Sequence, residues 1–244
     1  RLPTNGEYHI SVFPPSAPEF HSASSNDHYN PDPNSDPEFL VKDVLIGGDC
    51  FDVNNISLSS RPTSAGTFSA GLSSIGIDEG VVLATGTVDI GVGPNDITDA
   101  GTDDVGGAND PDLQQMVSEL FQGSNPPIFD ATILEFEFTP TVDSITFEYV
   151  FASEEYCDYV NSQFNDVFGF FISGPGINGN FSNNGDNIAV VPGTNDYVSI
   201  NTLNINSNPA FYVDNVPLGQ PQGAGGCTSE PNTPSPTSDF IQYD

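Results

Sequence analysis

The clearest alternation of apolar and polar positions lies between residues 145 and 151. Four large side chains recur there at every second position: Ile145, Phe147, Tyr149 and Phe151. An extended segment places such residues on one face, so the pattern predicts a strand. A nearly unbroken apolar run follows at 167–172, interrupted only by Gly169. This run predicts a second strand, covered on both faces or lying deep in a sandwich.

Shorter apolar segments separated by Gly, Ser and Pro predict further strands. They lie at 50–58, 66–71, 80–86, 130–140, 186–193 and 196–201. Within 130–140 the apolar residues alternate with Glu135 and Glu137, which is typical of a half-buried strand with its acids in solvent.

Two segments have the spacing of apolar residues that is typical of a helix. The first lies between Asp36, which precedes Pro37, and Gly47, which ends the helical pattern. In the second, Asp110 precedes Pro111, and an apolar stripe runs over 113–121. The whole pattern predicts an all-β protein: a jelly-roll-like β-sandwich with two short helices and long acidic loops.

The same pattern divides the chain. Residues 1–37 show no sustained period and predict an irregular N-terminal strap or linker. Residues 38–244 predict one β-sandwich domain, with a long Pro- and Gly-rich loop at about 206–238. The terminal sequence DFIQYD reads as the beginning of a strand, so we expect the sheet to lack its last strands.

The net charge of the chain restricts the classes of partner that the protein can bind. The chain has 34 acidic residues and only three Lys or Arg residues, which gives a formal net charge of -31. Phosphate backbones and anionic membranes are bound by Lys and Arg, so this imbalance argues against nucleic acid as a partner. No apolar stretch has the length of about 20 residues that crosses a bilayer, and we expect no direct membrane insertion.

Oxygen-bearing side chains gather between the two central strands. Those that we single out within residues 154–166 are Glu154, Glu155, Asp158, Asn165 and Asp166. No Lys or Arg follows Arg61, so carboxylates drawn toward the core lack a cationic partner. An unpaired buried ion costs several kcal/mol, and Ca²⁺ is the counter-charge that takes oxygen ligands.

A second acidic loop, 86–112, is a further source of ligands, although a solvated loop explains many of its acids equally well. The predicted calcium ligands are Asp104, Asp110, Asp112, Glu154, Glu155, Asn165 and Asp166.

The lack of histidine after His28 and of Lys and Arg after Arg61 also restricts the catalytic chemistry that is possible. All three histidines lie at or before His28, so the predicted domain has no Ser-His-Asp or Cys-His arrangement. We predict no catalytic and no organic cofactor-binding residues, and a protein that is not an enzyme. Three cysteines permit one disulfide, for which we predict Cys50 and Cys157. Cys227 is then free or paired outside this chain.

Several of these segments together carry a family resemblance. The blocks YVFASEEY and FNDVFGFFISGPGI, with FLVKDVLIGGDC and ATILEFEFTP, resemble the choice-of-anchor L domain of secreted and surface proteins of Bacteroidetes-type bacteria. The resemblance covers about residues 38–244. It implies a β-sandwich module of exported, adhesin-like proteins without known enzymatic activity. In such domains the FIQYD block is followed by further strands. We therefore expect either a fragment of a longer polypeptide or a domain completed by another segment.

The leading hypothesis is therefore a non-enzymatic, calcium-stabilised module of a surface adhesin or surface assembly, at the cell surface or outside the cell. One alternative is a calcium-dependent carbohydrate-binding module or a glycoside-active enzyme, since two suitably spaced carboxyls suffice for glycosidic cleavage. Another is a repeating subunit of an extracellular filament completed by strand donation. The expected partners are other surface proteins or neighbouring subunits, with glycans as a further class.

Overall fold

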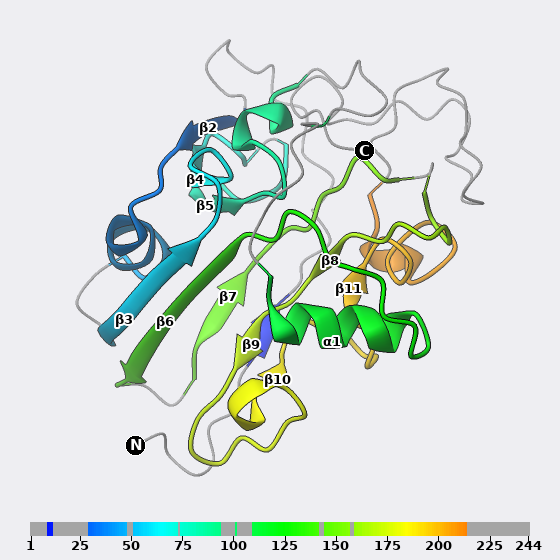
Figure 1. The fold of residues 1–244 in the computed structure, drawn as a ribbon. Helices are drawn as coiled ribbons and strands as arrows, with labels where there is room; N and C mark the ends of the chain where they lie inside the picture. The colour runs from blue at the N-terminus through cyan, green and yellow to red at the C-terminus, as the bar shows by residue number, and fades with distance from the viewer. Residues whose placement is uncertain are drawn as a thin grey trace.

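A computed structural model describes residues 9–11, 29–47, 51–72, 74–93, 101, 109–141, 144–156 and 159–213. Strands are the commonest element in these residues (Figure 1). They are β1 (His9–Ser11), β2 (Asn30–Pro33), β3 (Phe51–Ser59), β4 (Ala65–Ser69), β5 (Gly80–Leu83), β6 (Ile133–Pro140), β7 (Thr146–Glu148), β8 (Val167–Phe168), β9 (Phe171–Ile172), β10 (Asp186–Asn187) and β11 (Val198–Ser199). The helices are η1 (Phe39–Leu45), η2 (Val88–Gly91), α1 (Pro111–Leu120), η3 (Ser182–Asn184) and η4 (Pro209–Phe211).

The strands pair in small sheets. β2, β4 and β5 form a three-stranded antiparallel sheet, and β3–β6, β8–β11 and β9–β10 are antiparallel pairs. β1 and β7 pair in parallel. The described residues thus confirm the all-β class, while the jelly-roll order of the sandwich stays a prediction.

The longest pair is β3–β6, which lies along one side of the molecule (Figure 1). Its register shifts between Asn54 and Ser57, where two residues of β3 oppose one of β6. Asn55 adopts a positive φ of 50° at this bulge, and its amide donates to Glu137 Oε2 at 2.7 Å. Glu135 and Glu137 are exposed while the apolar residues between them are half-buried, as the alternation predicts.

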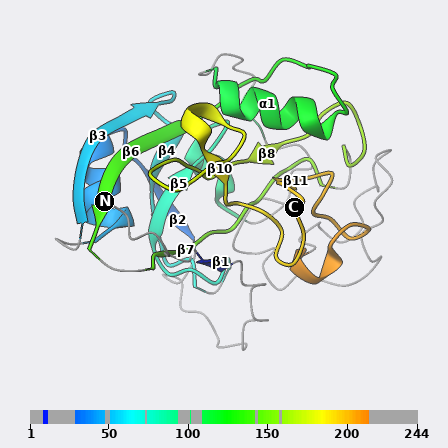
Figure 2. The ribbon, with the colours of Figure 1, turned by 90° about the horizontal axis from the view of Figure 1, so that it is seen from below.

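Both predicted helices are confirmed. The first is the π-helix η1, which buries Leu40 and Val41 completely, and Asp36 Oδ1 accepts from the backbone N–H of Glu38 at 3.1 Å. The second is α1, in which Met116 and Val117 face the core and which packs against β8 (Figure 2).

The two central strands are shorter than predicted. Only residues 146–148 of the first join a sheet, and the second is divided into β8 and β9. Gly169 lies at this division, and a Cβ atom there would come within 2.5 Å of the Phe171 ring. The ring therefore occupies space that a side chain would need, and the ladder breaks beside it.

The segment 1–37, expected to be irregular, contains β1 and β2. Pro31 and Pro33 both lie in β2, whose pairing partner is β4. Proline is tolerated in such a strand because β2 is at the edge of its sheet, where a missing N–H costs no ladder bond. The proline content that suggested a linker is thus compatible with an edge strand.

Two apolar clusters surround the segment that follows β7. One contains Tyr156, Val160 and Ile200, and the other contains Val191, Val198 and Leu203. Phe151 packs against both clusters and so joins them. Among the described residues, no helix is long and apolar enough to cross a membrane.

Candidate functional site

The predicted acidic segment begins with a turn over residues 154–156. Ser153, which is buried, precedes this turn and accepts a hydrogen bond from the Glu155 backbone N–H at 3.1 Å. The same hydroxyl donates to Asp166 Oδ2 at 2.7 Å. Ser153 therefore connects the turn that contains Glu154 and Glu155 with Asp166 at the end of the segment.

Asp166 is held in place by the strand that follows it. Its backbone carbonyl accepts from the Ile200 N–H at 3.2 Å, next to the β8–β11 pair, in which Val167 faces Ser199. Burial raises the pKa of the Asp166 carboxyl above its ordinary value, and the hydrogen bond from Ser153 opposes this shift only in part. The carboxylate is thus largely withdrawn from water.

Three asparagines tie the rest of the loop to the residues after β11. Asn165 Oδ1 accepts from the Asn201 N–H at 3.1 Å, and Asn201 Oδ1 accepts from the Asn161 N–H at 2.5 Å. Asn161 adopts a positive φ of 62°, a conformation that asparagine tolerates better than most residues. The loop between Glu155 and Asp166 is therefore anchored at both ends and near its middle.

Several polar atoms of this region are shielded from solvent. They are Tyr149 OH, Glu154 Oε1, Glu155 Oε2, Asn165 Nδ2 and Tyr212 OH. Of these, the Tyr149 hydroxyl and the Asn165 amide nitrogen make no hydrogen bond within the described part of the chain. Buried polar groups in proteins are nearly always satisfied, so these two atoms indicate a place for water. Only the phenol oxygen could also face a cation, because the amide nitrogen is a donor.

Aromatic side chains make the surroundings of Asp166 apolar. Tyr156 stacks obliquely on Tyr212 at 5.1 Å between ring centroids, and Tyr149 does so on Phe168 at 4.9 Å. Burial raises the pKa of Tyr149 to about 12, and burial followed by the Asp166 charge raises the pKa of Tyr156. Both phenols therefore stay neutral at physiological pH and add no negative charge beside Asp166.

The oxygen atoms around Asp166 would hold Ca²⁺ only if carboxylate and neutral oxygens both served as ligands. No group of three or more His, Cys, Asp or Glu side chains in the described ranges is arranged to hold a metal. At most two of Glu154, Glu155 and Asp166 would then ligate one ion in this arrangement. The remaining ligands would be neutral oxygens, which Ca²⁺ accepts from hydroxyls, amides, backbone carbonyls and water.

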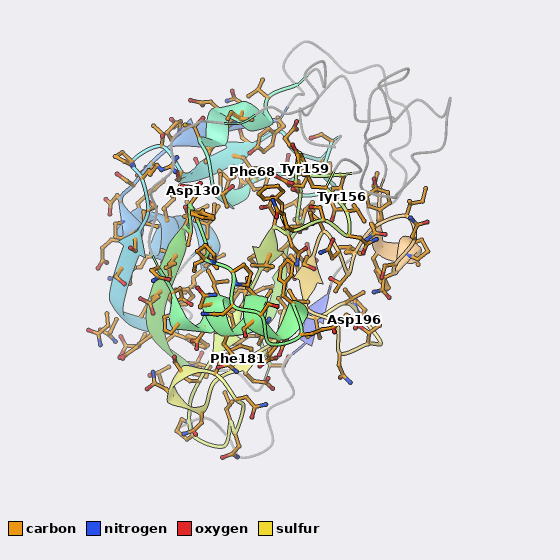
Figure 3. All side chains as sticks on the ribbon, turned by 45° about the vertical axis from the view of Figure 1, so that its right-hand side comes forward. Phe68, Asp130, Tyr156, Tyr159, Phe181 and Asp196 are labelled. Carbon is orange, nitrogen blue, oxygen red and sulfur yellow. The ribbon has the colours of Figure 1, made fainter. Side chains whose placement is uncertain are left out.

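The structure does not bring Asp110 and Asp112 to this site. Asp110 Oδ1 caps α1 by accepting from the N–H groups of Asp112 and Leu113 at 2.9 and 2.8 Å. Asp112 Oδ1 accepts from the Ser182 N–H at 2.7 Å. Phe181, the neighbour of Ser182, lies far from Tyr156 (Figure 3). Both acids thus have structural partners elsewhere in the fold.

Other predicted positions lie outside the described residues. These are Asp104 of the second acidic loop, Asp158 of the first, and the cysteines Cys50, Cys157 and Cys227. The disulfide between Cys50 and Cys157 and the role of Asp104 as a ligand stay predictions.

Sequence reasoning missed the residues that assemble the site. Ser153 had a detectable signal, because a serine two residues before Glu155 is the pattern of a local side-chain turn. Asn201 and Tyr212 had none. Asn201 is 36 residues from Asn165, and Tyr212 meets the Tyr156 ring only in the folded chain.

A family model described as the Choice-of-anchor L domain matches residues 28–230, which is most of the chain. The match includes residues 28–37 and therefore β2, which the sequence pattern had assigned to the N-terminal strap. No curated protein and no solved structure matches the chain.

Proposed function

The chain belongs to the Choice-of-anchor L family, a surface-associated domain, and we propose that it is a non-enzymatic β-sandwich module of a surface adhesin or assembly, stabilised by calcium. The family gives the surface or extracellular context. The calcium ion is our inference from the residues around Asp166. The lack of catalysis is inferred from the absence of histidine after His28, and the adhesive role from the family resemblance.

The observation that carries the proposal is the buried Asp166 carboxylate. It accepts a hydrogen bond from the neutral Ser153 hydroxyl, and the two cationic side chains in the described ranges are engaged elsewhere. Lys42 pairs with Glu38 on η1, and Arg61 pairs with Asp130, which lies apart from Tyr156 (Figure 3). With no uncommitted Lys or Arg in the described ranges, we infer that an external cation neutralises this carboxylate.

Calcium suits the site better than other common cations. The candidate ligands are oxygen atoms, and no described histidine or cysteine lies among them, which disfavours zinc and copper. Mg²⁺ demands octahedral geometry with short bonds, whereas Ca²⁺ accepts an irregular mixture of carboxylate, hydroxyl, carbonyl and water oxygens. A bound ion would fix the 154–156 turn against the start of β8, because both contribute oxygens.

Melting temperatures with calcium and with EDTA test this proposal. A ligand present at about 100 times its dissociation constant stabilises the folded state by about 2.7 kcal/mol. For a chain of this size we expect calcium to raise the melting temperature by about 5–10 °C. Mg²⁺ at equal ionic strength should give a much smaller rise.

A matched pair of variants locates the effect. Asp166→Asn keeps the side-chain shape but removes the charge, so the calcium-dependent rise should vanish. Asp78→Asn removes an exposed carboxylate from the loop between β4 and β5 and should retain the rise. Equal calcium responses in wild type and Asp166→Asn would contradict the proposed site.

A further inference from the structure

Two exposed aromatic rings lie beside the candidate site. Tyr159 is 38 % exposed and Phe164 is 51 % exposed, and their rings meet edge to face at 5.4 Å and 90°. Tyr159 projects next to Tyr156 (Figure 3). Single exposed apolar residues are ordinary, but two aromatic rings in mutual contact at the surface form a continuous apolar platform.

The backbone that presents these rings is anchored. The Tyr159 N–H donates to the Glu155 carbonyl at 2.9 Å, and the Ser162 N–H donates to the Tyr159 carbonyl at 2.9 Å. The Phe164 N–H donates to the Ser162 hydroxyl at 3.0 Å, and Asn161 is held by Asn201. A ligand would therefore find the platform already ordered, which lowers the entropic cost of binding.

Uncommitted amide groups flank the rings. Asn161 and Gln163 are exposed, and their side-chain amides make no hydrogen bond to the described residues. An amide offers both donors and an acceptor, and a sugar hydroxyl needs both. The combination of an apolar ring face and neighbouring amides matches a sugar ring, which has an apolar C–H face and a polar rim.

Charge determines which sugars fit. The described Lys42 and Arg61 are paired with Glu38 and Asp130, and no Lys or Arg occurs after position 61 in the sequence. An anionic sugar would therefore meet a strongly acidic protein without a cationic partner. A neutral sugar is therefore favoured over an anionic one. The net charge of -31 also suits a basic peptide, which the experiment below distinguishes from a glycan.

We propose that Tyr159 and Phe164, with the amides of Asn161 and Gln163, form a binding site for a neutral glycan. The apolar face of one sugar ring stacks on the aromatic pair while its hydroxyls exchange hydrogen bonds with the two amides. The proposal rests on the proposed function only in giving the surface module a partner class. It does not require calcium to ligate the sugar.

A glycan array carrying neutral and acidic oligosaccharides, probed with the full chain, tests the site. We expect binding to neutral glycans and none to sialylated or uronic-acid glycans. In titrations with a neutral glycan identified on the array, Tyr159→Ala and Phe164→Ala should each weaken binding roughly tenfold, because each removes one stacking ring. Phe129→Ala is the matched control, since Phe129 is 65 % exposed but adjoins Asp130, away from Tyr159 (Figure 3).

The outcomes separate this site from the calcium site. Loss of glycan binding in Phe164→Ala with an unchanged calcium-dependent melting shift supports the aromatic platform. The platform is overturned if no neutral glycan binds, or if Phe129→Ala weakens binding as much as Phe164→Ala. Binding of an oligolysine peptide through the same two rings, with no sugar bound, would instead identify a basic protein partner. Failure of the calcium proposal alone would appear only in the Asp166→Asn melting experiment.

Discussion

At the scale of single residues, Asp166 combines a fixed position with an unfavourable environment. Ser153 orients its carboxylate, and the Ile200 N–H fixes its backbone. Aromatic packing around Tyr156 removes the water that would otherwise solvate the charge. In the metal-free protein this burial favours the protonated acid, so Asp166 should hold its proton more tightly in the folded than in the unfolded chain.

The pH dependence of stability tests this environment. Because the pKa of Asp166 is raised on folding, the folded state binds more protons than the unfolded state above the ordinary value of 3.8. In EDTA, the contribution of Asp166 to stability should therefore fall as pH rises from 3.8 to its raised pKa. Urea unfolding over this range should show a smaller fall in Asp166→Asn than in wild type. Identical pH profiles would show that Asp166 is not the responsible group.

At the scale of elements, two acids that the sequence predicted as calcium ligands have structural roles in α1. Asp110 satisfies two N–H groups of the first turn, and Asp112 connects the helix to η3 through Ser182. Met116, four residues after Asp112 and thus on the same face of the helix, contacts the buried Asn187, whose amide donates to the sulfur at 3.4 Å. The helix is thus fixed to the β9–β10 region at its start and along its buried face.

Removing the cap should destabilise the protein without changing its calcium response. Asp110→Ala leaves two N–H groups of α1 without their acceptor and should lower the free energy of unfolding by about 1 kcal/mol. Asp110→Asn preserves an acceptor oxygen and should stay close to wild type. Urea unfolding measures both variants. A lost calcium-dependent melting shift in Asp110→Asn would instead show that this residue is a ligand, as the sequence predicted.

At the scale of the whole molecule, repulsion between like charges dominates outside the core. The formal net charge of -31 is spread over a chain with three Lys or Arg residues, so most carboxylates repel one another without a cationic neighbour. The Arg61–Asp130 pair is an exception and is largely shielded from solvent. Repulsion between like charges destabilises the compact folded state relative to the unfolded chain.

Salt should therefore stabilise the protein. Raising NaCl from about 0.01 M to about 0.15 M shortens the Debye length from about 30 Å to about 8 Å and screens this repulsion. We expect the melting temperature in EDTA to rise over this range, by differential scanning calorimetry. Choline chloride should give the same rise if screening is the cause. A fall in melting temperature with added salt would contradict the view that repulsion between carboxylates limits stability.

Features that depend on neighbours in sequence were predicted, and features that depend on distant residues were not. The cap of α1, the helix between Asp36 and Gly47, and the alternation around Glu135 depend on neighbours in sequence, and all three were predicted. The division of the 167–172 strand was not, because it depends on where the Phe171 ring lies relative to Gly169. β2 was missed because its prolines are compatible with a strand only at a sheet edge, and edge position is a tertiary property.

The sequence by itself determined the strand-rich class, the family, and the absence of Lys and Arg beyond Arg61, because each is written in local periodicity or composition. Only the tertiary structure decided which acids share a site. It joined Asp166 to the 154–156 turn through Ser153 and assigned Asp110 and Asp112 to α1. It also exposed Tyr159 and Phe164 as a contacting pair. Proximity between oxygen atoms or rings arises from packing of distant segments, which spacing along the chain does not encode.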